Sequence, residues 1–214
     1  MNISVVKIDN AKLENLRLRT PEYLELVDCT DGKKVRKPAG VSLSWSEDFL
    51  FVDFLVDDDH IWGTYTHDND PIYNEEAVEI FIAFGKDDSK EYWELQFSPN
   101  AVKYCAKVYN PTGDRSDVKF EVKAGIEIDG LEFLQNVDVK SQNENFKTGF
   151  WRTIIKIPAQ AIKGGAFTPA DLLRANFYRI DGYPKQNSFQ ALSPNFVKPA
   201  NFHVPNKFLK MELS

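Results

Sequence analysis

The sequence predicts an all-β fold in which two antiparallel sheets pack as a β-sandwich of the immunoglobulin-like or jelly-roll type. Short runs of alternating apolar and polar residues recur along the chain, and Gly, Pro, Asn or Asp bound each run. Helical periodicity is nearly absent. Aromatic residues, which favour pleated strands, make up 13% of the chain. No repeat or flexible linker divides the 214 residues, so we expect one domain spanning residues 1–214.

The first predicted strands are residues 40–45, 49–59 and 76–85. Val41, Leu43 and Trp45 share one face of the first, and a Ser-Glu-Asp turn precedes the second. The third strand alternates, with Val78, Ile80 and Ile82 on one face and Glu79, Phe81 and Ala83 on the other. Because the side chains of a strand alternate between its faces, one of these two sets is expected to face the core.

The later predicted strands are residues 91–100, 101–110, 117–129, 150–158 and 173–183. The first of these places Tyr92, Glu94 and Gln96 on one side and Trp93, Leu95 and Phe97 on the other. On the last, Asn176 and Tyr178 share a face that Arg179 does not. These patterns predict neighbouring strands that each have one polar or aromatic face.

Two segments have some helical character. Residues 158–164 begin with Pro and end with Gly, which predicts one or two helical turns. Residues 11–26 are ambiguous, because Pro21 would interrupt a helix there.

Charge and cysteine content exclude several classes of protein. The net charge is −6, so neither a nucleic-acid partner nor an anionic membrane is expected. Cys29 and Cys105 lack metal-binding spacing and are predicted to be buried thiols rather than a disulfide. The amino terminus lacks a secretion signal and no stretch reaches transmembrane length, which predicts a soluble, cytoplasmic protein as the chain stands, or a secreted one if a signal was removed. The sequence gives no indication of oligomeric state.

Five segments in a fixed order carry a resemblance to a known family: residues 49–84, 92–100, 150–158, 173–181 and 202–213. They resemble the family 9 carbohydrate-binding module (CBM9) and its wider group of CBM9-like, DOMON-related domains. The resemblance covers most of residues 40–214. It implies a β-sandwich that binds a polysaccharide such as xylan or glucan, or the end of a sugar chain, without cleaving it. Structural calcium ions also occur in the family.

The resemblance also implies site residues. Family members clamp a pyranose between two Trp side chains, and those positions correspond here to Tyr73 and Phe202. Glu79 matches the family's sugar-binding Glu, and Asn201 resembles its sugar-binding Asn. Ser98 replaces the family's Arg, so two smaller rings and a lost cation distinguish this chain from the family pattern.

The expected ligand-binding residues are Tyr73, Glu79, Gln96, Asn201 and Phe202, with Tyr178 and Arg179 as second choices. An aromatic ring covers the apolar C–H face of a pyranose, and carboxylate or amide groups hydrogen-bond its hydroxyls. The alternative for the two rings is that they cap the ends of the sheets. The alternative for Glu79 is a solvated position at a sheet edge.

Other chemistry is less well indicated. Asp57, Asp58 and Asp59 offer oxygen ligands and are weak candidates for a calcium site, although a solvated acidic turn is the favoured interpretation. No nucleophile elbow, P-loop or dinucleotide fingerprint is present, so catalysis is not expected. Two alternatives remain: a sugar-active enzyme using acidic residues near Glu79, or a structural or interaction domain that has lost its sugar site.

Overall fold

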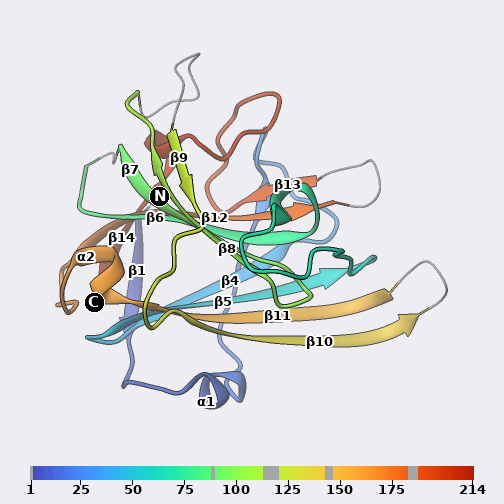
Figure 1. Cartoon of the computed structure of the whole chain (residues 1–214), viewed down its shortest axis with the longest axis horizontal. Helices are drawn as coiled ribbons and strands as arrows, with labels where there is room; N and C mark the ends of the chain where they lie inside the picture. The colour runs from blue at the N-terminus through green and yellow to red at the C-terminus, as the bar shows by residue number, and fades with distance from the viewer. Residues whose placement is uncertain (1, 88–89, 113–120, 143–146, 183–187) are drawn as a thin grey trace.

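The computed structural model describes residues 2–87, 90–112, 121–142, 147–182 and 188–214. The described strands form one strongly curled sheet that folds into two packed layers (Figure 1). In Figure 1 the long strands β5, β11 and β10 form the lower layer, and β6, β7 and β12 lie above them. This arrangement confirms the predicted all-β sandwich.

The strands of the lower layer are β10 (Glu132–Gln142), β11 (Lys147–Pro158), β5 (Phe49–Asp58), β4 (Ala39–Trp45) and β2 (Leu24–Glu25). The upper layer contains β14 (Leu209–Leu213), β12 (Leu172–Asp181), β6 (Ala77–Phe84), β7 (Glu91–Phe97), β8 (Lys103–Tyr109) and β9 (Glu121–Ala124), with β13 (Ser188–Ala191) and β3 (Val27–Asp28) beside β12.

Strand β1 (Asn2–Lys7) joins the two layers. Its residues 2–5 pair with β14, whereas Val6 and Lys7 pair with β4, and both pairings are parallel. All other described strand pairs are antiparallel. The chain therefore closes one side of the sandwich with its first strand.

The helices are short. Helix α1 (Leu13–Arg17) ends before Pro21, and its residues Leu13 and Leu16 pack on Phe51 of the lower layer. Helix α2 (Ala159–Lys163) is followed by Gly164 in the left-handed conformation at φ 81°, which confirms the predicted helical turn. The 3₁₀ turns η1 (Ile72–Asn74) and η2 (Pro205–Lys207) complete the elements.

The main differences from the sequence predictions lie at the edges of the layers. Strand β10 was not predicted, because its side chains are largely exposed and lack a regular apolar alternation. The predicted strand 117–129 is shorter, since only β9 is a strand within its described part; residues 117–120, like Tyr183 of the last predicted strand, lie outside the described residues.

The core lies between the layers. Val78, Ile80 and Ile82 of β6 face the lower layer, where Phe54 and Trp151 are fully buried. Phe54 meets Phe177 of the upper layer edge-to-face, with ring centroids 6.2 Å apart. Cys29 and Cys105 are buried and unpaired, as predicted.

A second apolar cluster covers the outer face of the upper layer. It includes Phe81, Tyr92 and Tyr178 from three neighbouring strands, and Phe202 and Phe208 from the segments that lie over them. The alternating residues of β6 thus face two different apolar environments. Polar residues on this outer face are therefore buried as well.

Candidate functional site

A row of four polar or aromatic side chains crosses the outer face of the upper layer. Strand register places Tyr178 beside Glu79, Glu79 beside Gln96, and Gln96 beside Tyr104, across β12, β6, β7 and β8. In the next row, Phe81 lies beside Glu94. Directly opposed residues on one face of a sheet are in side-chain contact, so this face concentrates groups that are distant in sequence.

A cavity of about 550 Å³ lies over this row, within the size range of small-molecule sites. Its floor includes Glu79, Glu94 and Gln96, and its walls come from β8, β9, β13, the turn η1 and the segment 200–203. Of the predicted ligand-binding residues, the cavity brings together Tyr73, Glu79, Gln96, Asn201 and Phe202.

Phe202 is positioned by Tyr178 beneath it. Their rings stack with centroids 4.1 Å apart and planes inclined by 13°, and Phe202 is only 8% exposed. The Tyr178 hydroxyl donates a hydrogen bond of 3.1 Å to the Phe202 carbonyl, and it accepts one of 3.0 Å from Asn176 Nδ2. Tyr178 therefore covers one face of Phe202, Phe81 and Phe189 pack edge-to-face against it at 6.4 and 5.9 Å, and only the small exposed part of the ring is accessible from the cavity.

Tyr73 is held from the other side of the cavity. Its neighbour Ile72 is buried and anchors the 3₁₀ turn, while Tyr73 itself is 44% exposed. The Tyr73 ring packs edge-on against Tyr104, with centroids 5.6 Å apart. The two aromatic positions are thus unequal: Tyr73 is the accessible ring and Phe202 the buried one.

The loop that carries Asn201 is fixed by hydrogen bonds. Asn195 Nδ2 donates to the Asn201 carbonyl at 2.6 Å, and the backbone N–H of His203 donates to Asn201 Oδ1 at 2.8 Å. Asn110 Nδ2 donates to the His203 carbonyl at 3.2 Å. The Asn201 side chain is therefore ordered by its own loop at the wall of the cavity.

The floor of the cavity contains two buried carboxyl groups. Glu79 is 2% exposed and Glu94 5%. Burial, and then the nearby charge of Glu94, hold the pKa of Glu79 well above its usual range. Burial raises the pKa of Glu94 to about 7, although the hydrogen bond from Gln96 Nε2, 2.6 Å long, opposes this shift.

Two acceptor atoms of this floor have no hydrogen-bond partner within the described part of the chain: Glu79 Oε1 and Gln96 Oε1. Both belong to side chains that are at least 98% buried and that line the cavity. A buried polar atom without a partner costs free energy, so these atoms are prepared to accept hydrogen bonds from a bound molecule.

His203 lies against the same carboxyl groups but does not supply a positive charge. Burial lowers its pKa to about 4, so the ring is neutral near pH 7. Its Nδ1 lies 2.8 Å from the Tyr92 hydroxyl, while its Nε2 is 4.0 Å from Glu94 Oε2, too far for a hydrogen bond. The imidazole therefore shapes the wall without neutralising Glu94.

The two second-choice residues, Tyr178 and Arg179, do not line the cavity. Tyr178 is fully buried and supports Phe202 from below. Arg179 is also fully buried but points to the opposite face of β12, because successive side chains of a strand alternate. It therefore does not replace the family's sugar-binding Arg.

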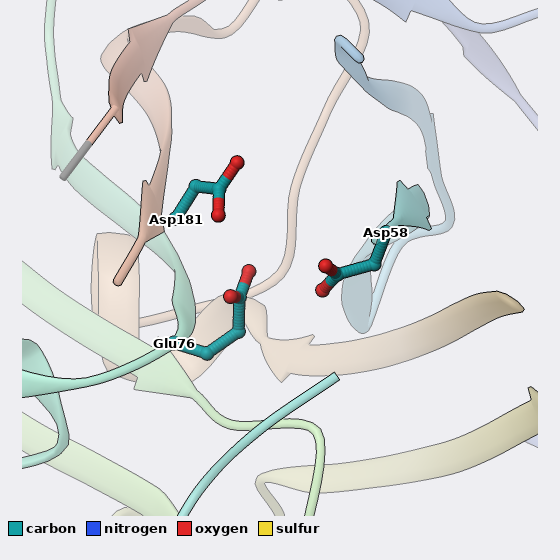
Figure 2. A group of neighbouring side chains, drawn as sticks. All are labelled: Asp58, Glu76 and Asp181. Atoms are coloured by element: carbon teal, nitrogen blue, oxygen red, sulfur yellow. The ribbon is translucent and has the colours of Figure 1, made fainter. Parts of the chain in front are cut away.

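Arg179 belongs to a second acidic cluster, formed by Asp58, Glu76 and Asp181 (Figure 2). Figure 2 shows these three carboxylates pointing toward one another from the end of β5, the residue just before β6 and the end of β12. Arg179 Nη2 lies 2.9 Å from Glu76 Oε1, 3.3 Å from Asp58 Oδ2 and 3.5 Å from Asp181 Oδ2. The guanidinium is the internal counter-charge of this cluster.

This arrangement decides how well the cluster fits calcium. The three carboxylates lie close enough to share an ion, and Glu76 Oε2 has no hydrogen-bond partner within the described residues. However, Arg179 Nη2 is within 3.5 Å of all three carboxylates, and calcium requires six to eight oxygen ligands. The residues present therefore fit the Arg179 guanidinium better than a calcium ion.

The Asp57-Asp58-Asp59 run does not act as one unit. Asp58 turns inward, where its Oδ2 accepts a hydrogen bond from Trp151 Nε1 at 3.1 Å. Asp57 and Asp59 lie at the surface, where Lys37 Nζ contacts them at 2.7 and 2.8 Å. The favoured interpretation of a solvated acidic turn describes Asp57 and Asp59 but not Asp58.

The sequence interpretation missed two groups of cavity residues. The sequence alternation places Glu94 on the same face as Gln96 but does not assign it to the ligand-binding residues. Tyr104 and His203 were not assigned to the site. No local pattern distinguishes them, because only the strand register and the folded loop bring them to the cavity.

A different cavity, of about 400 Å³, lies on the outer face of the lower layer and is lined mainly by aliphatic residues. Its buried carboxylate, Asp53, already accepts hydrogen bonds from Arg152 at 3.0 and 2.7 Å, and its other acidic residue, Glu22, is exposed. It therefore lacks the unpartnered polar atoms that mark the cavity over β6 and β7.

Comparison with known proteins agrees with this fold. A protein from Bacteroides uniformis described as carbohydrate-binding superposes with a TM-score of 0.74 at 14% identity, covering 100% of this chain and 99% of that one. A family 9 carbohydrate-binding module from Caldicellulosiruptor kristjanssonii in complex with cellotriose gives a TM-score of 0.63 at 13% identity, covering 100% and 94%. These likenesses establish a shared fold.

A sequence relative is found in Arthroderma benhamiae, where it is described as an extracellular protein. It is 32% identical over 152 residues, which represent 67% of this chain, and the chain spans 63% of the length of that relative. None of the helices in the described residues combines the length and apolar character needed to cross a bilayer. The profile of carbohydrate-binding family 9 matches residues 34–213, and the chain therefore belongs to carbohydrate-binding family 9.

Proposed function

We propose that this protein binds a glucan- or xylan-type saccharide, or the end of such a chain, without cleaving it, in the cavity over β6 and β7. Tyr73 and Phe202 would contact the apolar face of a pyranose, and Glu79, Gln96 and Asn201 would hydrogen-bond its hydroxyls. The residues 1–214 would act as one domain, in keeping with β1, which pairs with strands of both layers.

The main support for this proposal is that hydrogen-bond acceptors without partners and aromatic side chains line the same cavity. Glu79 Oε1 and Gln96 Oε1 lie in the floor without hydrogen-bond partners in the described chain, while the half-exposed Tyr73 and the edge of Phe202 line the same cavity. A pyranose presents hydroxyl donors at its rim and C–H groups on its faces. Such a ligand would satisfy both kinds of surface together.

The relatives support the chemical class. The Caldicellulosiruptor module of the same family is seen in complex with cellotriose and, in another structure, with glucose, where the TM-score is 0.59 at 13% identity and 96% of that chain is covered. We therefore expect gluco-oligosaccharides to bind at least as well as xylo-oligosaccharides. Because the Arthroderma relative is described as extracellular, we further propose that binding takes place outside the cell, where polysaccharides are exposed.

The proposal is tested by calorimetric titration with cello- and xylo-oligosaccharides. Tyr73→Ala removes the accessible ring, and its affinity should fall about tenfold, corresponding to the loss of about 1.4 kcal/mol. Tyr73 is 44% exposed, so the variant should remain folded. Tyr109→Ala is the matched control: Tyr109 is 41% exposed and does not line the cavity, and its loss should leave affinity unchanged.

Two results would contradict this assignment. Absence of binding to every saccharide by folded protein would favour a structural or interaction domain. Turnover of a chromogenic glycoside, lost in Glu79→Gln, would instead favour a sugar-active enzyme.

Structural calcium, which the family resemblance implies, is not part of the proposal, because Arg179 supplies the positive charge of the acidic cluster. We expect the melting temperature of the wild-type protein to be the same in calcium chloride as in EDTA. A rise with calcium, following the mass-action law for a ligand of the folded state, would show that the protein binds the ion after all.

A further inference from the structure

The floor of the cavity holds two carboxyl groups that share one low-dielectric space. Glu79 lies opposite Gln96 in the strand register, and Glu94 is two residues earlier on the same face of β7, which makes the two carboxyl groups diagonal neighbours. Both are almost fully buried. Two like charges in this position repel each other and are poorly solvated, so the pair needs either a proton or a cation.

No described residue that lines the cavity supplies that cation. The titratable groups facing the pair are Tyr73, Tyr104 and His203, and none of them carries a positive charge near pH 7 because His203 is neutral. Tyr92 and Tyr178, which pack against the floor from β7 and β12, are phenols whose pKa values are raised by burial.

The hydrogen-bonding atoms of the floor are mainly acceptors. Gln96 Nε2 is committed to Glu94 Oε1 at 2.6 Å, which orients Gln96 Oε1 away from that bond and leaves it without a partner in the described chain. Glu79 Oε1 is likewise unpartnered. With the second oxygen of Glu94, this geometry offers three acceptors, whereas an ammonium group has three N–H donors and no acceptor.

We infer that the cavity selects a cationic amino sugar, a hexosamine with a free amine, whose ammonium group lies between Glu79, Glu94 and Gln96. This inference rests on the proposed carbohydrate-binding function and specifies the class of sugar. The amine supplies the positive charge that the described cavity residues lack, and its hydrogen bonds to the two carboxylates are charge-assisted and therefore strong. The sugar ring keeps the contacts with Tyr73 and Phe202 described above.

The preference depends on pH in a defined direction. The pKa of Glu94 is raised to about 7, and burial holds that of Glu79 well above its usual range, so lowering the pH from 7 to 5 favours the protonated form of the pair. A protonated pair neither attracts an ammonium group nor accepts from it with both oxygens. Glucosamine affinity should therefore increase from pH 5 to pH 7, and its binding should release protons into the buffer.

The test compares D-glucosamine, D-glucose and N-acetyl-D-glucosamine by calorimetric titration at pH 7 and pH 5, in two buffers of different ionisation enthalpy. At pH 7 glucosamine should bind at least about tenfold more tightly than either neutral sugar, as expected for a hydrogen bond to a charged group. Glu94→Gln should remove most of this preference, because glucosamine affinity should fall by a larger factor than glucose affinity. Glu91→Gln, the same substitution at an exposed position of β7 outside this cavity, should retain the preference.

Each outcome bears on a different claim. If glucose binds and glucosamine binds no more tightly, the amine inference is wrong and the carbohydrate proposal stands. If none of the three sugars binds to the folded protein, both are wrong. If the preference for glucosamine persists in Glu94→Gln, or disappears equally in Glu91→Gln, the preference comes from overall negative charge and the inference is wrong. Competition by calcium chloride at matched ionic strength would also overturn the inference, because a divalent cation would then be the better occupant of the floor.

Discussion

Two clusters of buried carboxyl groups flank the same sheet, and they differ in what neutralises them. Asp58, Glu76 and Asp181 surround the guanidinium of Arg179. Glu79 and Glu94, on the outer face, have no such partner among the described cavity residues. In both clusters burial raises carboxyl pKa values: the pKa of Glu76 is raised to about 8 and that of Glu94 to about 7.

The difference indicates that burial of acid alone does not define a binding site. Where the fold supplies its own cation, the cluster ties together the ends of β5, β6 and β12 and has a structural role. Where the fold supplies none and the carboxyls face a cavity, the missing partner is expected to come from a ligand or from protons. The predictions below test this contrast in order of decreasing effect.

Arg179→Met should have the largest effect on the stability of the protein. It removes the cation but keeps an unbranched apolar stem, leaving three carboxyl groups without a counter-charge. Loss of one partner of a buried ion pair typically costs about 3–5 kcal/mol, and we expect that decrease in the free energy of unfolding at pH 7, measured by urea denaturation.

The matched control is Arg36→Met, which removes an arginine whose side chain is 78% exposed and pairs with Asp59. Its cost should be below about 1 kcal/mol. If Arg179→Met were no more destabilising than Arg36→Met, the internal-cation interpretation would be wrong. With Arg179 absent, calcium should raise the melting temperature of the variant, because the three carboxylates then have room for an ion.

Glu94→Gln should increase the free energy of unfolding, by less than Arg179→Met decreases it. In the folded state the pKa of Glu94 is raised to about 7, above its unfolded value near 4.3, so its contribution to stability is present at low pH and is lost as pH rises through 7. The neutral variant avoids this loss. Its free energy of unfolding should exceed that of the wild type at pH 8 by on the order of 1–3 kcal/mol.

The informative quantity is the difference between variant and wild type, since Glu76 and Asp53 also have raised pKa values and affect both proteins alike. Parallel denaturation at pH 5 and pH 8 should show a difference that is smaller at pH 5 than at pH 8, because the loss builds up between the unfolded pKa near 4.3 and the folded pKa of about 7. A constant difference would mean that Glu94 is already ionised at pH 5 or that the change acts through packing.

The sequence predicted the inner strands well because burial imposes a regular pattern on them. In β6 the set Val78, Ile80 and Ile82 faces the core, as the alternation indicates. Strand β10 lacked such a pattern because, among the described strands, it pairs with β11 alone and has mostly exposed side chains. The role of β1 as a bridge could not be derived locally, since it depends on pairing with residues more than 200 positions away.

The positions of candidate site residues were predictable where the alternation within a single strand determines which face a side chain occupies. The position of Glu79 follows from the alternation of β6, and that of Gln96 from β7. The alternation of β12 already places Arg179 on the face opposite Tyr178, but the sequence does not indicate its partner Glu76, which comes from a different segment. Tyr178 was assigned to the right face, but the sequence did not indicate that Phe202 would cover it.

Lys37→Met should have the smallest effect and completes the contrast. Lys37 Nζ contacts two carboxylates, Asp57 and Asp59, at 2.7 and 2.8 Å, but their side chains are 43% and 47% exposed. Water solvates these acids when the lysine is removed, so the loss should be below about 1 kcal/mol and should largely vanish in 1 M salt, where the screening length is about 3 Å. Urea denaturation of Lys37→Met and Arg179→Met at low and high salt measures both effects together. If the two variants lost equal stability, exposure would not be what separates the surface pair from the buried cluster.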